Sequence, residues 1–161
     1  MYTSTPPDTT PAGMTLRQGD ASDIPGALPL LAAYRAFYGL PTDSTALAAY
    51  LQARLVAGEA TLWLASLPEQ PVAVALCYRG YSTLSLARND LLHDLYVDPG
   101  WRRQGIAAAL LQAIQHSIPP GGSLWLETAH SNHSAQALYL GLGFVPDSAF
   151  LTMSWQRPAD L

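Results

Sequence analysis

Hydrophobic and polar positions change their period several times along the chain. Leu31, Tyr34 and Tyr38 recur at the spacing of one helical face, whereas the run from Val72 to Tyr78 is continuously apolar, as in a buried strand. The predicted elements are a strand at 14–18, a helix that starts at Asp20 or Ser22 and ends at Gly39, a helix from Ser44 to Gly58, strands at 61–66, 72–81 and 91–97, a helix at 104–117, a strand at 124–129, a helix at 134–142 and a strand at 150–155.

This order of elements predicts an α/β (α+β) domain built on a mixed, mostly antiparallel sheet. The strand–helix–strand unit within 91–129 is expected to be right-handed, with its two strands parallel. Residues 1–13 are rich in Thr and Pro, so we expect a flexible N-terminal tail there. Residues 14–161 are expected to form a single domain, because 161 residues suit one hydrophobic core.

Composition and charge narrow the class of protein. Hydrophobic residues make up 49% of the chain and charged residues only 12%, which favours a packed domain over a disordered one. The net charge is −4, and all eight basic residues are Arg, with Arg102-Arg103 the one adjacent pair. We therefore expect no nucleic-acid partner. No segment approaches the roughly 20 apolar residues of a membrane span, so we expect no membrane association.

Cysteine and histidine positions add little chemistry of their own. The single Cys77 cannot form an internal disulfide and lies in an apolar run, so we expect a buried structural thiol. A reducing, cytoplasmic location fits one cysteine, and no apolar stretch precedes Arg17 that would resemble a secretory signal. The His and acidic residues lack the spacing of metal ligands, and we expect no metal site.

A turn between a strand and a helix is the first candidate binding site. The strand at 91–97 leads into Arg102-Arg103-Gln104-Gly105-Ile106-Ala107, where a helix begins. Free N–H groups and the positive end of the helix dipole make such a start an anion site. Two arginines there oppose the dipole, which makes sense beside a bound anion. A solvated Arg pair beside an ordinary helix start explains the same residues.

Two motifs in order resemble those of the GNAT N-acetyltransferase superfamily. Residues 102–107 resemble its Arg/Gln-x-x-Gly-x-Gly/Ala motif, with Ala107 where Gly is commoner. Residues 132–144 resemble its Asn-x-x-Ala-x-x-Leu-Tyr-x-x-x-Gly-Phe block at every defined position. The resemblance covers roughly residues 14–156 and is weakest before residue 60. It implies the GNAT fold, with about six to seven strands, flanking helices and a splayed central parallel strand pair.

The resemblance also implies a cofactor site for acetyl-CoA. Backbone groups of Leu95 and Val97 would pair with the pantetheine arm, and Asn132 would bind the pantetheine or orient the thioester. Tyr139 would protonate the departing thiolate, although a core-facing tyrosine on an amphipathic helix is the alternative. The implied cofactor-binding residues are Leu95, Tyr96, Val97, Arg102, Arg103, Gln104, Gly105, Ile106, Ala107, Asn132 and Ala135.

A general base is sought among the four histidines, because an amine must lose a proton before it attacks. His93 on the central strand is the first candidate, and a structural histidine is the alternative. Strand alternation places His93 and Asp94 on opposite faces, so only one should reach a given side of the sheet. Asp94 could instead anchor a loop or the acceptor amine. Glu127, His130 and water are rivals, while His116 is expected on the surface near a helix C-terminus.

The acceptor is expected beside the first helix, because in this superfamily the first two helices border it. Tyr34 and Tyr38 could bind an amine by cation–π attraction, although core packing explains them too. We expect transfer of acetyl from acetyl-CoA to a primary amine, small-molecule or peptide, by direct attack in a ternary complex. The alternatives are a protein N-terminal or lysine acetyltransferase and a non-catalytic acyl-CoA-binding module. Members of the superfamily often dimerise, so a homodimer is also expected.

Overall fold

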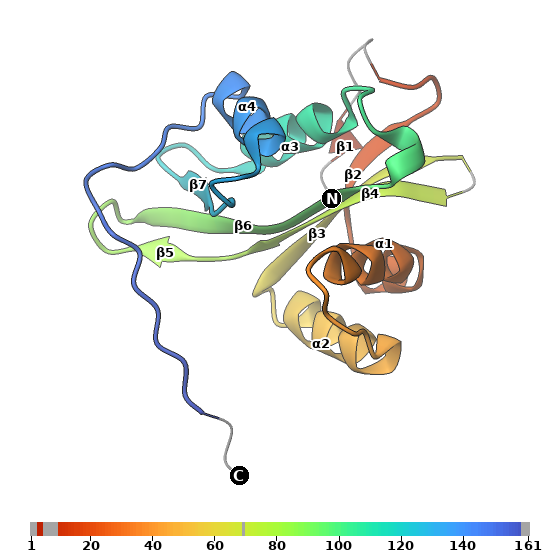
Figure 1. Ribbon diagram of the computed structural model, residues 1–161, viewed down its shortest axis with the longest axis horizontal. Coiled ribbons are helices and arrows are strands. Elements are labelled where there is room, and N and C mark those ends of the chain that lie inside the picture. Colours follow the sequence, from red (N-terminus) through yellow and green to blue (C-terminus); the bar gives the residue numbers. More distant parts are fainter. Residues whose placement is uncertain (1–2, 5–9, 69, 159–161) are drawn as a thin grey trace.

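The computed structural model describes residues 3–4, 10–68 and 70–158, and these form one sheet with helices on both faces (Figure 1). The elements are β1 (Thr3–Ser4), β2 (Thr15–Gly19), the 3₁₀ turn η1 (Ala21–Asp23), α1 (Ile24–Phe37), α2 (Ser44–Val56), β3 (Ala60–Leu67), β4 (Gln70–Tyr78), β5 (Tyr81–Ser82), β6 (Ala87–Val97), the 3₁₀ turn η2 (Pro99–Trp101), α3 (Ile106–Ser117), β7 (Ser123–Leu126) and α4 (His133–Gly141).

The sheet of the described chain has seven strands in the order β1-β2-β3-β4-β6-β5, with β7 paired to β6. Its pairs are antiparallel except β6–β7, which is parallel. The predicted mixed, mostly antiparallel sheet with a central parallel pair is thus confirmed. In Figure 1, α1 and α2 cover one face and α3 and α4 the other. Most of the predicted tail, residues 1–2 and 5–9, lies outside the described residues.

Two hydrophobic clusters hold these layers together. Trp63 and Ala65 of β3 join the cluster beneath α3, whereas Leu62 and Leu64 join the cluster beneath α1 and α2. Successive side chains of a strand point to opposite faces, and here each face is covered by helices. This is why β3 and β4 are apolar along most of their length. Cys77 is buried in the α3-side cluster, as expected.

The helix starts follow from local capping. Asp20 caps η1 by accepting a hydrogen bond from the N–H of Ser22, so the first predicted start is confirmed. The second helix is capped by Asp43 instead of Ser44: Asp43 Oδ1 accepts from the N–H of Thr45 at 2.9 Å and of Ala46 at 3.1 Å. The carboxylate stands one residue before the first helical residue, where a side-chain acceptor reaches the free N–H groups.

Some strand boundaries differ from the prediction. The run 72–81 divides into β4 and β5, and β6 begins at Ala87 because it pairs with β5 there. The helix predicted from residue 104 starts at Ile106, since Gly105 has a left-handed conformation. The strand predicted at 124–129 ends at Leu126, where its pairing with β6 also ends. The alternation of apolar and polar residues does not predict these ends, because the end of a strand depends on where its pairing with a neighbouring strand begins and stops.

The strand predicted at 150–155 is wrong for the described chain. These residues pair with no strand among the described residues, and Phe150, Leu151, Met153 and Trp155 are 80–91% exposed. Figure 1 shows this segment running past β5 and away from the sheet. An apolar alternating segment becomes a strand only against a free backbone edge, and within this chain it meets none.

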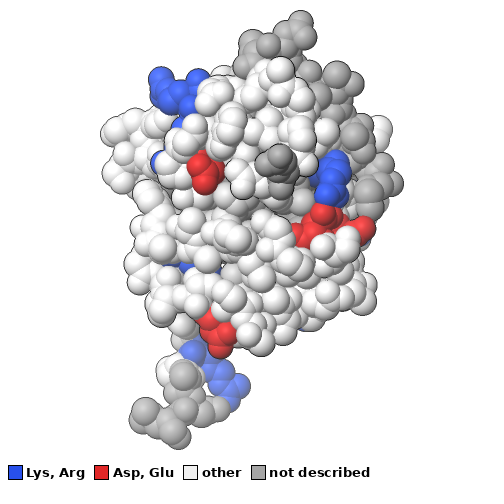
Figure 2. All heavy atoms as spheres, turned by 90° about the vertical axis from the view of Figure 1, so that its right-hand side faces the viewer, with Lys and Arg blue, Asp and Glu red and all other residues white. Residues whose placement is uncertain are grey.

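The surface carries little charge. On the face shown in Figure 2, blue and red side chains are few and are separated by large uncharged areas. None of the helices in the described part of the chain combines the length and the apolar character needed to cross a bilayer.

Candidate functional site

A β-bulge in β6 sets the direction of the two candidate catalytic side chains. Leu76 of β4 lies opposite Asp94, but Cys77 lies opposite Leu92, so His93 is an extra residue on β6. Because of this extra residue, His93 and Asp94 both project to the α1–α2 side, where they line the same cavity. The prediction that they occupy opposite faces is therefore wrong, since strict alternation does not hold across a bulge.

His93 and Asp94 form a hydrogen-bonded pair. Nδ1 of His93 lies 2.8 Å from Oδ1 of Asp94, and the His93 side chain is 56% exposed while that of Asp94 is 14% exposed. The hydrogen bond to Asp94 raises the pKa of His93, and partial burial opposes this rise. The ring also packs edge-on against Tyr78, with centroids 5.2 Å apart. Asp94 thus orients the imidazole and makes it a stronger base.

An aromatic cavity of about 1030 Å³ opens beside this pair, between α1, α2 and the sheet. Tyr34 of α1 and Tyr38, the residue that follows the end of α1, both line it, with ring centroids 5.2 Å apart. The hydroxyl of Tyr34 donates to the carbonyl oxygen of His93 at 3.4 Å, which ties α1 to the bulge. The two predicted acceptor residues are thereby brought to the catalytic pair.

Two further tyrosines of this cavity were not among the predicted site residues. The hydroxyls of Tyr50, on α2, and Tyr78, on β4, lie 2.9 Å apart, and both rings line the cavity. Burial raises the pKa of the Tyr78 phenol, which keeps it protonated at neutral pH. Sequence reasoning could have found Tyr50 from its place on the second helix, but the pairing of β4 was needed to bring Tyr78 to it.

On its other side, β6 has a free backbone edge. Its parallel pairing with β7 covers Asn89 to Leu92 and stops at the Leu92–Leu126 pair. The N–H of Asp98 donates to the carbonyl oxygen of Val72 on β4. The backbone groups of successive strand residues point alternately to the two edges of the strand, so the N–H and C=O groups of Leu95 and Val97 point away from β4. The strands β6 and β7 are therefore splayed where a bound chain could pair with residues 95–97.

The turn before α3 is shaped as an anion site. Arg103 and Gly105 have positive φ values of 63° and 75°, and Gly105 caps α3 without any side-chain hydrogen bond. No side chain of the cap residue accepts hydrogen bonds from the first N–H groups of α3, so a bound ligand can accept them. The helix dipole adds positive potential at this end of the helix. Ile106 is buried in the core and Arg102 to Gly105 are exposed, so a ligand would meet the backbone of this turn.

Arg102 lies across the start of the free edge. Its Nε donates to the carbonyl oxygen of Val97 at 2.9 Å, and its guanidinium carbon is 5.3 Å from the centre of the Tyr96 ring. These two contacts hold the side chain over β6. Residues 95–97 and 102 of the predicted cofactor site are therefore adjacent in space.

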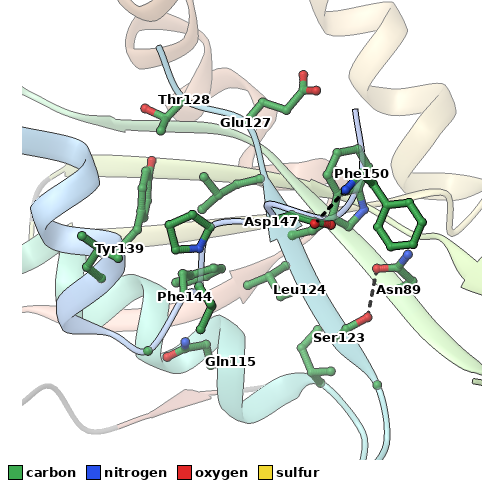
Figure 3. Close-up of a pocket in the computed structure, with 18 of the residues that line it drawn as sticks. Asn89, Gln115, Ser123, Leu124, Glu127, Thr128, Tyr139, Phe144, Asp147 and Phe150 are labelled. Atoms are coloured by element: carbon green, nitrogen blue, oxygen red, sulfur yellow. Dashed lines mark hydrogen bonds between the residues drawn. The ribbon is translucent and has the colours of Figure 1, made fainter. Parts of the chain in front are cut away.

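Asn132 is the N-cap residue of helix α4. The Oδ1 of Asn132 accepts from the N–H of Ala135 at 3.2 Å, which fixes the first turn of the helix. Tyr139 follows on the same helix, partly buried against the α3-side cluster, with its ring centroid 5.7 Å from that of Phe144. Figure 3 shows its ring beside β7, near Glu127 and Thr128. Burial raises the pKa of Tyr139, so its phenol remains a proton donor at neutral pH.

The pKa values of Tyr139 and Tyr34 are each affected by a tyrosine on the other face of the sheet. Helix α4 lies on the opposite face from α1, yet Tyr139 contributes to the raised pKa of Tyr34, after burial, Asp94 and Tyr38. Tyr38 in turn adds to the effect of burial on Tyr139. Tyr139 lines the groove beside β7, whereas Tyr34 and Tyr38 line the aromatic cavity on the other face of the sheet.

The rival base candidates are placed differently. Glu127 is exposed at the end of β7 and contributes to the raised pKa of His93, while His130 lines the groove beside β7. His116 lies exposed in the last turn of α3, as predicted, where its Nδ1 is 2.7 Å from the Gln112 carbonyl oxygen. Among the described residues, no three His, Cys, Asp or Glu side chains are grouped as metal ligands.

Comparison with known proteins agrees with this geometry. The acetyltransferase (GNAT) family model matches residues 29–144. The uncharacterized N-acetyltransferase YhfO of Bacillus subtilis (strain 168) is 32% identical over 148 residues, which cover 91% of this chain and 99% of YhfO. The crystal structure of a probable acetyltransferase has a TM-score of 0.79 and 27% identity, covering 89% of this chain and 99% of that one.

A shorter match concerns a protein-modifying enzyme. The ribosomal protein bS18-alanine N-acetyltransferase of Escherichia coli (strain K12) is 44% identical over 55 residues. These residues cover 33% of this chain and 37% of that enzyme.

Proposed function

Because the chain belongs to the acetyltransferase (GNAT) family, we propose that this N-acetyltransferase moves an acetyl group from acetyl-CoA to a primary amine by direct attack in a ternary complex. The observation that carries the proposal is the His93–Asp94 pair, which lies on the wall of the aromatic cavity. The pair belongs to β6, the same strand whose backbone edge at Leu95 is not paired with β7.

The residues present fit acetyl-CoA. The uncapped N-terminus of α3 and its left-handed turn offer N–H groups to a pyrophosphate, and Arg103 adds positive charge beside them. The edge at Leu95 and Val97 offers N–H and C=O groups to the amides of a pantetheine arm, with the Val97 carbonyl oxygen already accepting one hydrogen bond from Arg102. When bound there, acetyl-CoA supplies an activated acyl group as a thioester.

His93 is proposed to take the proton from the acceptor amine. An alkylammonium has no lone pair, so attack requires a base near neutrality. Nδ1 of the His93 ring lies 2.8 Å from Oδ1 of Asp94. In the tautomer with the hydrogen on Nδ1, this hydrogen is donated to Asp94 and Nε2 is the atom that accepts the proton. Glu127, His130 or water are the alternatives. Tyr139 is proposed to give a proton to the leaving sulfur, because its raised pKa keeps the phenol protonated.

The proposed acceptor is a small amine with an apolar body. Four tyrosines line the cavity, and their ring faces attract a cation while their hydroxyls offer hydrogen bonds. Asp94 supplies the negative charge that an ammonium group needs on entering. Leu31, Leu47 and Leu76 line the same space and suit a hydrocarbon or aromatic body.

A peptide N-terminus is the second candidate, favoured by the match to the bS18-alanine enzyme. That match spans about a third of either chain, so it does not extend to the whole acceptor surface. A non-catalytic acyl-CoA-binding module is the third candidate. Such a module would need the α3 turn but not the His93–Asp94 pair in the aromatic cavity.

A screen of acceptors with detection of the released CoA thiol tests these candidates. We expect turnover with arylalkylamines, less with polyamines, and little with peptides that begin with alanine. Preference for the peptides would favour the second candidate. Binding of CoA by calorimetry without turnover on any amine would favour the non-catalytic module. The buried Cys77, whose pKa is raised to about 12 by burial, should add little thiol background.

A further inference from the structure

The hydroxyl groups of Tyr50 and Tyr78, which form the tyrosine pair, hold one more proton than their own hydrogen bond uses. Their oxygen atoms lie 2.9 Å apart, and either can be the donor. Each phenol carries one O–H, so the hydrogen bond between them uses one of the two protons. Within the described part of the chain, neither hydroxyl has another hydrogen-bond partner. Both residues line the aromatic cavity, so the second O–H is available to a molecule bound there.

Leucine side chains lie on the cavity wall next to the tyrosine pair. Leu47 and Leu51 stand three residues before and one residue after Tyr50 on α2, and Leu76 stands two residues before Tyr78 on β4. All three leucines line the cavity. A phenol O–H in such surroundings loses its water when a ligand fills the cavity, and an O–H left without a partner lowers the affinity of that ligand. The pair thus favours a ligand that brings a hydrogen-bonding group to this point.

The charges near the tyrosine pair favour a neutral group. Burial raises the pKa of Tyr78, and the hydrogen bond to Tyr50 and the negative charge of Asp94 raise it further, so Tyr78 remains protonated at neutral pH. Arg54, whose positive charge opposes this rise, forms an ion pair with Glu59 at 2.8 Å. A carboxylate bound at the pair would face Asp94, while the nearby cation already has a partner.

Arg35 also lines the cavity, but it is held at the other end of α2. Its Nη2 donates to the carbonyl oxygen of Pro41 at 2.9 Å, and its Nε donates to Oγ1 of Thr42 at 3.2 Å. These two residues precede α2, whereas Tyr50 lies about 10 Å further along the helix axis. The cavity therefore has a charged end at the loop and a neutral polar point at the tyrosine pair.

Tyr78 lies on the side of Asp94 that is away from the edge proposed for pantetheine. Leu76 of β4 pairs with Asp94. Tyr78, two residues or about 6–7 Å further along β4, pairs with Leu91. The edge proposed for pantetheine begins at Leu95, in the opposite direction along β6. An amine whose nitrogen faces that edge beside Asp94 therefore extends its body toward the tyrosine pair.

We propose that the tyrosine pair binds a neutral hydroxyl group on the body of the acceptor amine, several bonds from its nitrogen. This inference rests on the proposed function, since it concerns the same cavity. The O–H that is not used between Tyr50 and Tyr78 donates to the oxygen of that hydroxyl, and a phenol oxygen accepts the hydroxyl proton in return. The two tyrosines then determine specificity, because an amine without the hydroxyl leaves one O–H unpaired.

Calorimetric titration of the full chain with three amines tests the proposal. Phenethylamine has no hydroxyl, tyramine carries one at the far end of its ring, and the isomeric phenylethanolamine carries one beside the amine-bearing carbon. Saturating CoA, which has no acetyl group, is present so that binding is measured without turnover. Tyramine should bind about 3- to 10-fold tighter than phenethylamine, and phenylethanolamine should show no such gain. Equal dissociation constants, a gain confined to phenylethanolamine, or no binding of any amine would overturn the proposal.

A tyramine analogue with a carboxylate in place of the hydroxyl tests whether the bound group is neutral. It should bind no tighter than phenethylamine, because Asp94 lies in the same cavity. Tighter binding than phenethylamine would contradict the assignment to a neutral hydroxyl.

The double variant Tyr50→Phe/Tyr78→Phe removes both hydroxyls and keeps both rings. The dissociation constants of tyramine and phenethylamine should then become equal, whereas Tyr81→Phe, at an exposed tyrosine outside the cavity, should keep the preference. If the two hydroxyls only tie α2 to β4, both amines lose affinity alike and the preference for tyramine persists, which refutes the proposal. Thermal unfolding checks the fold. Tyr50→Phe alone, at the more exposed ring, should reduce the preference and replaces the double variant if that protein unfolds.

Release of the CoA thiol from acetyl-CoA with the same amines separates this inference from the proposed function. No turnover of any amine, with the tyramine preference in binding intact, would reject acetyl transfer and leave the hydroxyl site. Turnover of phenethylamine and tyramine with equal kcat/KM and equal dissociation constants would reject the hydroxyl site and leave acetyl transfer.

Discussion

The Nδ1 atom of His93 lies 2.8 Å from Oδ1 of Asp94, although the two residues are neighbours on one strand. In a regular strand their side chains would point to opposite faces. The bulge opposite Leu76 and Cys77 lets both enter the cavity between α1, α2 and the sheet. The bulge thus creates a carboxylate–imidazole pair from consecutive residues.

Asp94→Asn should move the acidic limb of the pH profile of kcat/KM to lower pH. The hydrogen bond to Asp94 raises the pKa of His93 above its ordinary value of 6.5, and below its pKa the ring is protonated and cannot accept a proton. Without the carboxylate the pKa falls, so the neutral ring persists to lower pH. His93→Gln should remove this limb, while His116→Gln, far along α3, should leave it unchanged. If the acidic limb of Asp94→Asn lies at the same pH as in the wild type, the general base is a group other than His93.

Gly105→Glu should abolish most CoA binding while the fold persists. The side chain would put a negative charge among the N–H groups that receive the pyrophosphate, and the loss should be about 10-fold or more in affinity. Gly121→Glu is the matched control, because Gly121 also has a positive φ, of 80°, with open space around its Cβ position. Both variants should lose about 1–2 kcal/mol of stability from the left-handed conformation. Calorimetry measures the CoA affinity of the two variants, and thermal unfolding measures their stability. Equal CoA affinities of Gly105→Glu and Gly121→Glu would show that the turn before α3 does not bind CoA.

Tyr139→Phe should lower kcat by about 10²–10⁴-fold and leave CoA affinity unchanged. The phenol acts on the charge that develops on the leaving sulfur, so its contribution appears in the transition state. The ring and its contact with Phe144 remain, so unfolding should shift little. Tyr81→Phe, at an exposed tyrosine of β5, serves as the control. Wild-type turnover would reduce Tyr139 to a packing residue and favour the binding module.

Tyr38→Leu should raise the KM of the amine acceptor about 2–30-fold without changing CoA affinity. The ring of Tyr38 lines the acceptor cavity, and cation–π attraction is lost when it becomes aliphatic. Tyr81→Leu, on β5 outside that cavity, should leave this KM unchanged. If Tyr38→Leu changes only thermal stability, Tyr38 supports α1 and does not bind the acceptor.

Local signals in the sequence predicted most of the elements and the cofactor turn. Gly105 marks the start of α3 because it adopts a left-handed conformation, and the Asp20 cap is likewise local. The resemblance of residues 102–107 and 132–144 to family motifs then identified the family. These features depend on residues close together in the chain, so a single sequence contains them.

The features that sequence analysis missed depend on pairing between distant residues. The bulge at His93 arises from the register of β6 on β4, and the Tyr50–Tyr78 contact joins a helix to a strand. The segment at 150–155 has a strand pattern, but a pattern does not reveal whether a free edge is within reach. Each of these features depends on how residues far apart in the sequence pair or pack.

In the proposed mechanism the two substrates approach opposite faces of one sheet, and this separation has a consequence for evolution and engineering. Leu40, Pro41, Thr42 and Asp43 in the α1–α2 connection line only the acceptor cavity, while the acetyl-donor turn lies on another part of the chain. Exchanging residues 39–42, with the Asp43 cap of α2 kept, should therefore select new amines without rebuilding the donor site.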